Sequence, residues 1–352
     1  MSVSSGITRI GLVAVVAALA TSSLAACSTQ GTEQSATDLA GASVPIGRGG
    51  EEVTIGLTYV PNVQFSPVYV AAADEIFRAA EVGPVIRHHG SDEGLFTALT
   101  SGEEDITVAS GDEVLQARAA GLDLVAIGAY YDQYPVAIIS KEGSGIDSLT
   151  DLKGKSIGLP GEFGSNWFGL LAALDRAGLE PSDVTIVSVG YTQAASLATD
   201  AVDAVVGFVN SDAVQLEQMG VKTVVLPLAD FDVPLVGATI VTTREWLESH
   251  PDLARSVVEA VTAGMDRVIQ NPQHALEVTA NWDPSLRQGE ARATAARLLE
   301  ATIPLWERSD GKASAVQDIE TWNRMAPFLS GILGVPEVDM GLDQAVTNDF
   351  AS

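Results

Sequence analysis

The stretch SIGLPGEFGSNWFGLLAALDRAG, residues 156–178, contains a complete strand–loop–helix unit. Residues 156–159 form a short, largely apolar run, as in a buried strand. Residues 166–177 have the apolar spacing of a helix, and Gly178 ends it. The loop between them, residues 160–165, leaves the backbone N–H groups at the helix start free to meet a polar ligand atom. It lacks the lysine of a nucleotide-binding loop. This unit predicts an α/β fold in which loops after strands carry the function.

The same alternation of short β-branched strands and helices continues over most of the chain. It is typical of α/β architecture with a largely parallel sheet. Strands are predicted at residues 53–57, 85–88, 106–109, 124–128, 135–140, 156–159, 184–189, 204–208, 223–226 and 237–242. Helices are predicted at residues 67–80, 94–101, 111–120, 166–177, 193–199, 212–219, 251–270, 272–281, 285–302 and 315–332.

The order of these elements predicts two lobes. The chain is expected to cross to the second lobe near Tyr134-Pro135 and to return near Leu235-Val236. Lobe 1 then comprises residues 51–134 and 237–352, and lobe 2 comprises residues 135–236. Ligands of such sheets lie beyond the carboxyl ends of the strands. The loops of both lobes are therefore expected to line one cleft.

The first 50 residues predict a secreted, lipid-anchored protein. Arg9, the apolar run from Gly11 to Ala20 and the small residues Ala25-Ala26 precede Cys27, the single cysteine. This pattern resembles a bacterial lipoprotein signal, in which the cysteine is acylated and becomes the new N-terminus. Residues 1–26 are then the signal peptide, and residues 27–50 form a flexible stalk. The body is expected outside the cell membrane, attached to it through the lipid.

Charge and cysteine content exclude several classes of protein. The chain has 19 basic and 46 acidic residues, a formal net charge of −27. Such a surface repels nucleic acid, which proteins bind by neutralising phosphate with lysine and arginine. With one cysteine no internal disulfide is possible, so both lobes depend on their apolar cores.

Three segments in the expected order resemble one protein family. They are SLTDLKGKSIGLP at residues 148–160, AVDAVVGFVN at residues 201–210, and Tyr59-Val-Pro-Asn62 followed by Tyr69-Val-Ala-Ala. The chain is similar over about residues 53–270 to the NMT1/THI5-like group of solute-binding proteins of ABC importers. The resemblance implies a type II periplasmic-binding-protein fold, a small-molecule solute, ABC permease and ATPase subunits as partners, no cofactor, and a monomer.

Residues at the predicted strand ends are the candidates for solute binding. Aromatic rings there can stack on a planar ligand, and carboxylates or amides can pair with its polar edge. The candidates are Tyr59, Asn62, Tyr69, Asp112, Glu113, Tyr130, Glu162, Gly164, Ser165, Trp167, Asn210 and Asp212. Some have structural alternatives: Asp112 and Ser165 as helix caps, and Asp212 as a first-turn charge. Tyr134 has the same placement, as do Phe65 and Tyr131, for which a core position is equally plausible.

The scarcity of basic residues in the first part of lobe 1 favours a heteroaromatic solute over an oxyanion. Between Glu52 and Ser140 there is no lysine, and the arginines are Arg78, Arg87 and Arg118. Sulfonate, nitrate or phosphate recognition usually recruits arginine or lysine. A thiamine-type pyrimidine or riboflavin is expected, with an alkanesulfonate- or nitrate-type oxyanion as the alternative. Arg118, on the helix after Asp112, is the residue that would favour the oxyanion.

An enzyme is the alternative from another class. Pyrimidine synthases of the same fold, as the resemblance implies, need a pyridoxal-phosphate lysine and a histidine near the first cleft loop. Residues 61–65 contain no histidine, and the first lysine is Lys141. The adjacent His88 and His89 are expected on opposite faces of a strand, so no metal site is predicted. A sensor built from the same two lobes stays open, because nothing in the sequence separates sensing from transport.

Overall fold

The computed structural model describes residues 43–45, 49–90 and 93–351, and these residues belong to one compact unit. The predicted signal peptide, Cys27 and most of the predicted stalk lie outside the described residues. Residues 43–45 are an exception, because they form strand β1 (Ser43–Pro45) and pair antiparallel with residues 85–87. This part of the predicted stalk is therefore attached to a sheet by backbone hydrogen bonds.

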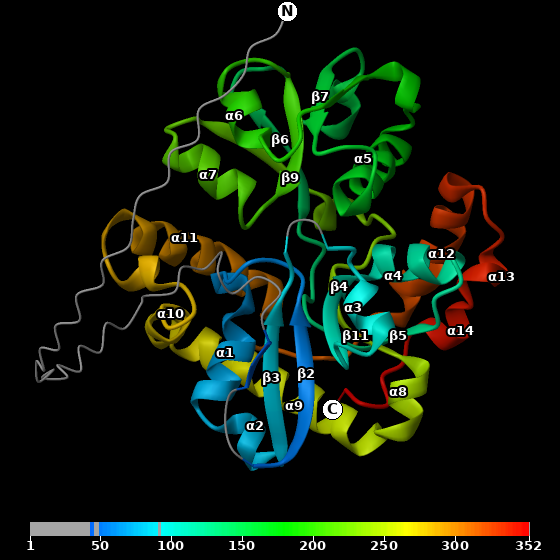
Figure 1. Cartoon of the computed structure of the whole chain (residues 1–352). Coiled ribbons are helices and arrows are strands. Elements are labelled where there is room, and N and C mark those ends of the chain that lie inside the picture. The colour runs from blue at the N-terminus through cyan, green and yellow to red at the C-terminus, as the bar shows by residue number, and fades with distance from the viewer. Residues whose placement is uncertain (1–42, 46–48, 91–92, 352) are drawn as a thin grey trace, which may run out of the picture. The chain divides into compact units, whose positions relative to one another are not determined.

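The first sheet has six strands in the order β1-β3-β2-β4-β11-β5 (Figure 1). Its further strands are β2 (Glu51–Leu57), β3 (Val82–His88), β4 (Ile106–Ser110), β5 (Leu124–Ala129) and β11 (Ala238–Thr243). β2 pairs parallel with β3 and β4, whereas β11 pairs antiparallel with β4 and β5.

The second sheet has five strands in the order β10-β6-β9-β7-β8. They are β6 (Val136–Lys141), β7 (Ser156–Leu159), β8 (Thr185–Ser188), β9 (Ala204–Phe208) and β10 (Thr223–Pro227). β7 pairs parallel with β8 and β9, whereas β6 pairs antiparallel with β9 and β10.

Both sheets are mixed, so the prediction of a largely parallel sheet needs correction. The chain leaves the first sheet after β5 and enters the second through residues 130–135, the first crossing segment. It returns through residues 228–237, the second crossing segment. The strand that follows each crossing starts where its neighbour ends: Val136 is opposite Phe208, and Ala238 is opposite Ser110. Such a strand must run against its neighbour.

Helices cover the faces of both sheets. In the first part of the chain they are α1 (Ser66–Ala73), α2 (Ile76–Ala79), α3 (Thr97–Ser101) and α4 (Gly111–Ala119). The second sheet carries α5 (Gly164–Ala177), α6 (Gln193–Ala198) and α7 (Asp212–Gln218). The last part of the chain contains α8 (Arg244–Ser249), α9 (Pro251–Gln270), α10 (Pro272–Thr279), α11 (Gly289–Trp306), α12 (Ile319–Leu333), α13 (Glu337–Met340) and α14 (Leu342–Ala345). Among the described helices, none is long and apolar enough to cross a membrane.

The helix predicted at residues 67–80 is divided into α1 and α2. Glu75 lies between them in the left-handed region, with φ of 60°. A residue there cannot continue a right-handed helix, so the axis changes direction. Local apolar spacing does not encode this break. The short helices α8, α13 and α14 were also not predicted, because few residues in each carry a periodic signal.

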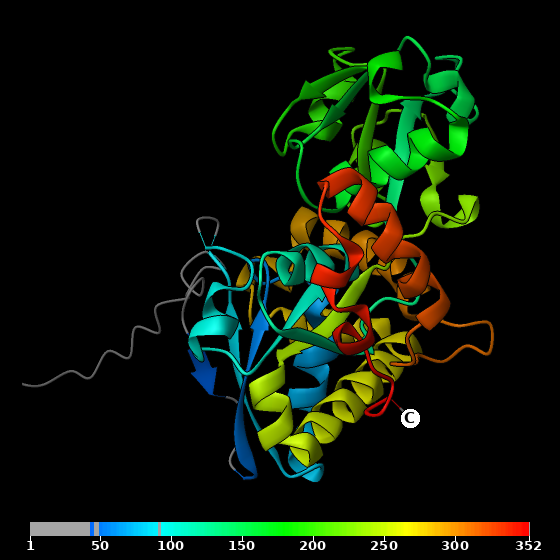
Figure 2. The ribbon, with the colours of Figure 1, turned by 90° about the vertical axis from the view of Figure 1, so that its right-hand side faces the viewer.

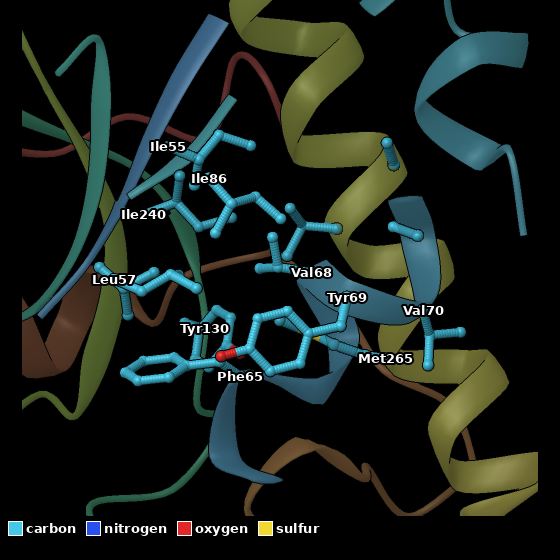
Figure 3. Packing of buried hydrophobic residues seen from close by; sticks show 14 of the residues in the cluster. Ile55, Leu57, Phe65, Val68, Tyr69, Val70, Ile86, Tyr130, Ile240 and Met265 are labelled. Carbon is cyan, nitrogen blue, oxygen red and sulfur yellow. The ribbon is translucent and has the colours of Figure 1, made fainter. Parts of the chain in front are cut away.

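Two large apolar clusters stabilise the fold. In the first, Ile55, Ile86 and Ile240 of the first sheet pack beside Val68 of α1 (Figure 3). Helix α9 packs on the same side, and α12 contacts α4 on the other side of the sheet (Figure 2). The second cluster includes Trp322 of α12 and also Phe168 of α5. It therefore continues from one sheet to the other around the crossing segments.

Candidate functional site

The loops after strands β4 and β7 meet through four side chains, which we call the serine–carboxyl cluster: Ser110, Asp112, Glu113 and Ser165. Ser110 ends β4, Asp112 and Glu113 lie in the first turn of α4, and Ser165 lies in the first turn of α5. The Ser110 Oγ lies 2.5 Å from Asp112 Oδ1 and 2.6 Å from Glu113 Oε2. The Ser165 Oγ lies 3.0 Å from Ser110 Oγ and 3.1 Å from Asp112 Oδ1. The cluster therefore joins the two sheets at the ends of their strands.

Helix capping explains the contact between Ser110 and Glu113 but not the position of Ser165. Ser110 and Glu113 form a capping box at the start of α4, in which the Ser110 backbone N–H donates to Glu113 Oε2 at 3.2 Å. Helix α5 has Phe163 at its N-cap and no side-chain cap. Ser165 therefore does not cap its own helix, and its hydroxyl is directed to the cluster across the gap between the sheets.

The cluster must hold a proton on a carboxyl group. The Ser110 hydroxyl has one hydrogen, yet two carboxyl oxygens lie within hydrogen-bond distance of it. If both carboxyls were ionised, one of these two contacts would have no hydrogen between its oxygen atoms and would be repulsive. Burial, with the nearby charge of Glu113, raises the pKa of Asp112 from 3.8 to about 7. Burial also raises the pKa of Glu113. Asp112 is fully buried whereas Glu113 is partly exposed, so burial favours the protonated form more strongly at Asp112.

Tyr134 connects the cluster to the first crossing segment. Its hydroxyl lies 2.8 Å from the backbone oxygen of Ser165 and 3.2 Å from Asp112 Oδ2. Its ring is buried in the second apolar cluster. A rotation of one sheet against the other must therefore change contacts of Tyr134.

Asn210 makes a second contact between elements of the two sheets. It follows β9, and its Nδ2 donates to Thr302 Oγ1 of α11 at 3.1 Å. Asn210 also hydrogen-bonds Tyr131 of the first crossing segment. Asn210 is buried, so it reaches a solute only if this contact opens. The sequence did not indicate Thr302, because a threonine within a helix carries no local signal of function.

Two aromatic rings are exposed on loops near the serine–carboxyl cluster. One loop follows β2, which pairs with β4, and the other follows β7. Tyr59, two residues after β2, is 57% exposed, and Phe163, directly before α5, is 54% exposed. Tyr191, after the edge strand β8, is 83% exposed. Among the candidates, Tyr59 is thus available for stacking. Phe163 was not predicted, although its place in the loop at residues 160–165 could have indicated it.

Other predicted rings lie in the core. Tyr69 is 1% exposed, stacks on Trp282 with centroids 4.9 Å apart, and places its hydroxyl 3.0 Å from His88 Nε2. Tyr130 and Phe65 belong to the same cluster. The sequence does not show which other segments pack on a ring near a strand end, so it could not assign these rings to the core rather than the cleft. Trp167 is half-buried against the second cluster.

The remaining polar candidates have local partners or face solvent. The Asn62 Oδ1 accepts from the Gln64 N–H at 3.1 Å and caps a short 3-10 helix at residues 63–65. The Asp212 Oδ2 accepts from the Phe208 N–H at 2.8 Å, and burial raises its pKa. Glu162 is exposed. Gly164 has a φ of 65°, which suits glycine, and a Cβ there would lie 3.6 Å from Glu113 Oε1.

The arginines that could favour an oxyanion have other partners. Arg118 donates to the backbone oxygens of Met340, at 2.6 Å, and Leu124, at 2.5 Å, and pairs with Asp123. It lies on the last turn of α4, away from the cluster at the first turn. Arg78 pairs with Glu75 on the surface.

Arg87 lies in a buried ionic cluster with His89, Glu93 and Glu104. Its guanidinium is 2.7 Å from Glu104 and 2.8 Å from Glu93, and His89 Nε2 is 2.8 Å from Glu104. Ligand atoms of His89, Glu93 and Glu104 lie within 4.8 Å of one another, a spacing that could hold a metal ion. The guanidinium already bonds to both carboxylates, so a cation would have to displace it. His88 faces Tyr69 instead, which agrees with opposite faces for the histidine pair.

Replacing Glu104 should strongly destabilise the protein. The variant Glu104→Gln leaves the Arg87 charge buried with one close carboxylate fewer, and breaking a buried pair in this way costs about 3–5 kcal/mol. Chemical denaturation should show this loss in the free energy of unfolding. Glu103→Gln is the matched control, because Glu103 is exposed and lies 3.9 Å from the same guanidinium. Equal effects of the two variants would contradict a buried ionic cluster.

Comparison with known proteins agrees with this architecture. The structure superposes on the periplasmic aliphatic sulphonate binding protein SsuA from Escherichia coli with a TM-score of 0.66 at 17% identity, covering 83% of this chain and 96% of that one. It also matches a Candida albicans protein described as having the generic periplasmic binding protein structural fold, with a TM-score of 0.58 at 15% identity, covering 85% and 96%. At such identities the likeness concerns the fold alone.

Sequence comparison reaches closer relatives. The chain is 31% identical over 307 residues to the riboflavin-binding protein RibY of Chloroflexus aurantiacus, covering 85% of this chain and 86% of that protein. It is 24% identical over 301 residues to a 4-amino-5-hydroxymethyl-2-methylpyrimidine phosphate synthase of Legionella pneumophila, covering 85% and 92%. The NMT1/THI5-like family model matches residues 62–275, more than half of the chain. With its periplasmic-binding-protein fold and these relatives, the chain belongs to the NMT1/THI5-like family.

Proposed function

We propose that this protein is an extracytoplasmic solute-binding receptor of an ABC importer, and that its solute is a flavin, with riboflavin as the first candidate. The observation that carries this proposal is the 31% identity to a riboflavin-binding protein across 85% of the chain. The expected thiamine-type pyrimidine is the second candidate. A permease and an ATPase are the partners that such a receptor needs.

The geometry supports a planar solute held between the two sheets. Tyr59 comes from a loop of the first sheet and Phe163 from a loop of the second, and both rings are exposed. An isoalloxazine ring offers two flat faces for stacking and an edge of alternating donors and acceptors. The partly exposed Glu113 can accept from such an edge. Closure of the two lobes around the solute is the expected hinge motion.

The partners of the arginines argue against an oxyanion receptor. Arg78, Arg87 and Arg118 each pair with a carboxylate, and Arg87 and Arg118 are buried. A sulfonate would have to break one of these pairs to bind one of these three guanidinium groups.

Binding without catalysis is also part of the proposal. Lys141, the first lysine of the chain, donates to the Ala198 backbone oxygen at 2.9 Å and to Asp200 at 2.6 Å. His88 has both ring nitrogens in contacts, and burial lowers its pKa to about 4, so it stays neutral at pH 7. These engaged groups suit a structural role. An absorbance band of an internal aldimine in the purified protein would favour the enzyme instead.

A titration series tests the solute. Residues 28–352 should bind riboflavin in isothermal titration, and Tyr59→Ala or Phe163→Ala should each weaken binding about tenfold, since a stacked ring pair contributes about 0.5–1.5 kcal/mol beyond the buried area. Tyr191→Ala, at the edge strand β8, is the matched control and should bind like the parent. Pyrimidine precursors and alkanesulfonates complete the series. Binding of sulfonates alone would refute the proposed solute class.

The location is proposed from the N-terminus. A lipid on Cys27 would keep the receptor beside its permease, outside the cytoplasmic membrane. Mass spectrometry of the protein from its own cells should find an acylated Cys27 as the first residue.

A further inference from the structure

A cavity of about 290 Å³ lies where the two crossing segments meet the C-terminal part of the chain. Its walls come from residues 129–134, residues 229–237 and residues 308–324. The volume corresponds to about ten water-sized groups, enough for a small polar solute. None of the four residues of the serine–carboxyl cluster contributes to these walls. The cavity adjoins the cluster through Tyr134, which lines the cavity and contacts Asp112 through its hydroxyl.

Two ion pairs cross the walls of the cavity, one for each crossing segment. The Arg308 Nε donates to Asp132 Oδ1 at 2.7 Å, and the Arg324 Nη1 donates to Asp232 Oδ1 at 2.8 Å. All four residues line the cavity. The side chains are partly exposed, at 35% and 26% for the first pair and 38% and 70% for the second. Ion pairs with this exposure contribute little to stability, so a solute can compete with them.

The walls also contain hydrogen-bonding groups that remain unused. Among the described residues, Arg324 Nε and Gln317 Oε1 have no hydrogen-bond partner, although both atoms are covered from solvent. A guanidinium has five N–H donors in a planar fork that fits a carboxylate. A small rotation of Arg324 toward a bound carboxylate would give its Nε an acceptor.

We propose that this cavity is a second binding site, for a small amino-acid-like zwitterion. The solute's carboxylate binds the guanidinium of Arg324 or Arg308, and its ammonium group pairs with the aspartate that this guanidinium releases. This exchange keeps every charge paired and leaves the net charge of the cavity unchanged. A simple anion that displaced Asp132 from Arg308 would leave this aspartate without a basic partner, in a chain whose net charge is already −27. Because both crossing segments form the walls, an occupant also restrains the hinge.

Calorimetric titration with γ-aminobutyrate tests the site directly. The purified protein should bind it at one saturable site, and butyrate or butylamine, each with one of the two charges, should bind at least tenfold more weakly. Arg324→Gln should weaken γ-aminobutyrate binding at least tenfold, and Arg308→Gln serves as a second variant. Arg176→Gln is the matched control, because Arg176 pairs with the same Asp232 at 2.9 Å but does not line the cavity.

Hydrogen exchange of the backbone amides gives the location. With γ-aminobutyrate bound, protection should rise in residues 130–135 and 228–237 and not in the loops after β2 and β7. The proposal is overturned by no binding, by equal binding of butyrate, by equal losses in Arg324→Gln and Arg176→Gln, or by protection at the cleft loops instead. Riboflavin plays no part in these measurements, so they stand apart from the proposed function.

Discussion

Gly264→Ala should destabilise the protein by about 3 kcal/mol, the upper end of the roughly 1–3 kcal/mol that overpacking a core contact typically costs. Gly264 lies on α9 where this helix crosses α1. A Cβ built there would lie 2.2 Å from the backbone oxygen of Pro67 and 3.1 Å from the Cβ of Ala71. A backbone atom cannot rotate away, so the two helices must separate. Their contact holds Val68 and Met265 in the first apolar cluster (Figure 3).

Gly331→Ala provides the matched control for this prediction. Gly331 also lies inside a long helix, α12, but a Cβ there meets no atom within 4 Å. Alanine should therefore raise the free energy of unfolding by about 0.5–1 kcal/mol, the difference in helix propensity. Thermal and urea unfolding of both variants measure the contrast. Similar changes in the two variants would contradict a close contact between α1 and α9.

Asp112→Asn should change how stability depends on pH. The native pKa of Asp112 is raised from 3.8 to about 7, so between these values the native state keeps a proton that the unfolded chain has lost. The contribution of this group is complete below pH 3.8 and is lost as the pH rises to 7. Three pH units correspond to at most about 4 kcal/mol. Asparagine does not titrate. As the pH rises from 3.8 to 7, the variant should therefore become more stable relative to the parent protein, by up to that amount.

The measurement is urea unfolding of both proteins from pH 4 to pH 8. Asp203→Asn is the control of opposite sign, because hydrogen bonds from Ser156 lower the pKa of Asp203. Its native carboxylate contributes stability above the ordinary pKa that is lost as the pH falls, so this variant should be the less stable protein at pH 7. A difference for Asp112→Asn that does not vary with pH would mean that the serine–carboxyl cluster holds no extra proton.

Much of the fold could be predicted because its signals are local. Residues 156–178 form strand β7, a glycine-rich loop and helix α5 as expected, and most other predicted elements agree within a few residues. The predicted helix at residues 315–332 is α12, in which Trp322, Met325 and Leu329 are buried at helical spacing. Each of these follows from spacing within one element. The direction of β6 and β11 could not be predicted, because it depends on where the chain enters a sheet.

The serine–carboxyl cluster could be predicted in part for the same reason. Asp112, Glu113 and Ser165 were chosen because they follow strands, and the structure brings them together with Ser110. Ser110 itself was missed, since it reads as an ordinary helix cap. Tyr69 also follows a predicted loop, but the packing of Trp282, more than 200 residues later in the chain, places it in the core.

Sequence alone specifies the alternation of strands and helices, the strong negative charge, the loops that follow the strands, and the family. These are properties of neighbouring residues or of composition. Tertiary structure decided which aromatic rings remain exposed, that Asp112 is fully buried beside a second carboxyl, and that Ser165 bonds across to the other sheet. Burial and the pKa it changes depend on atoms from distant parts of the chain, so only packing establishes them.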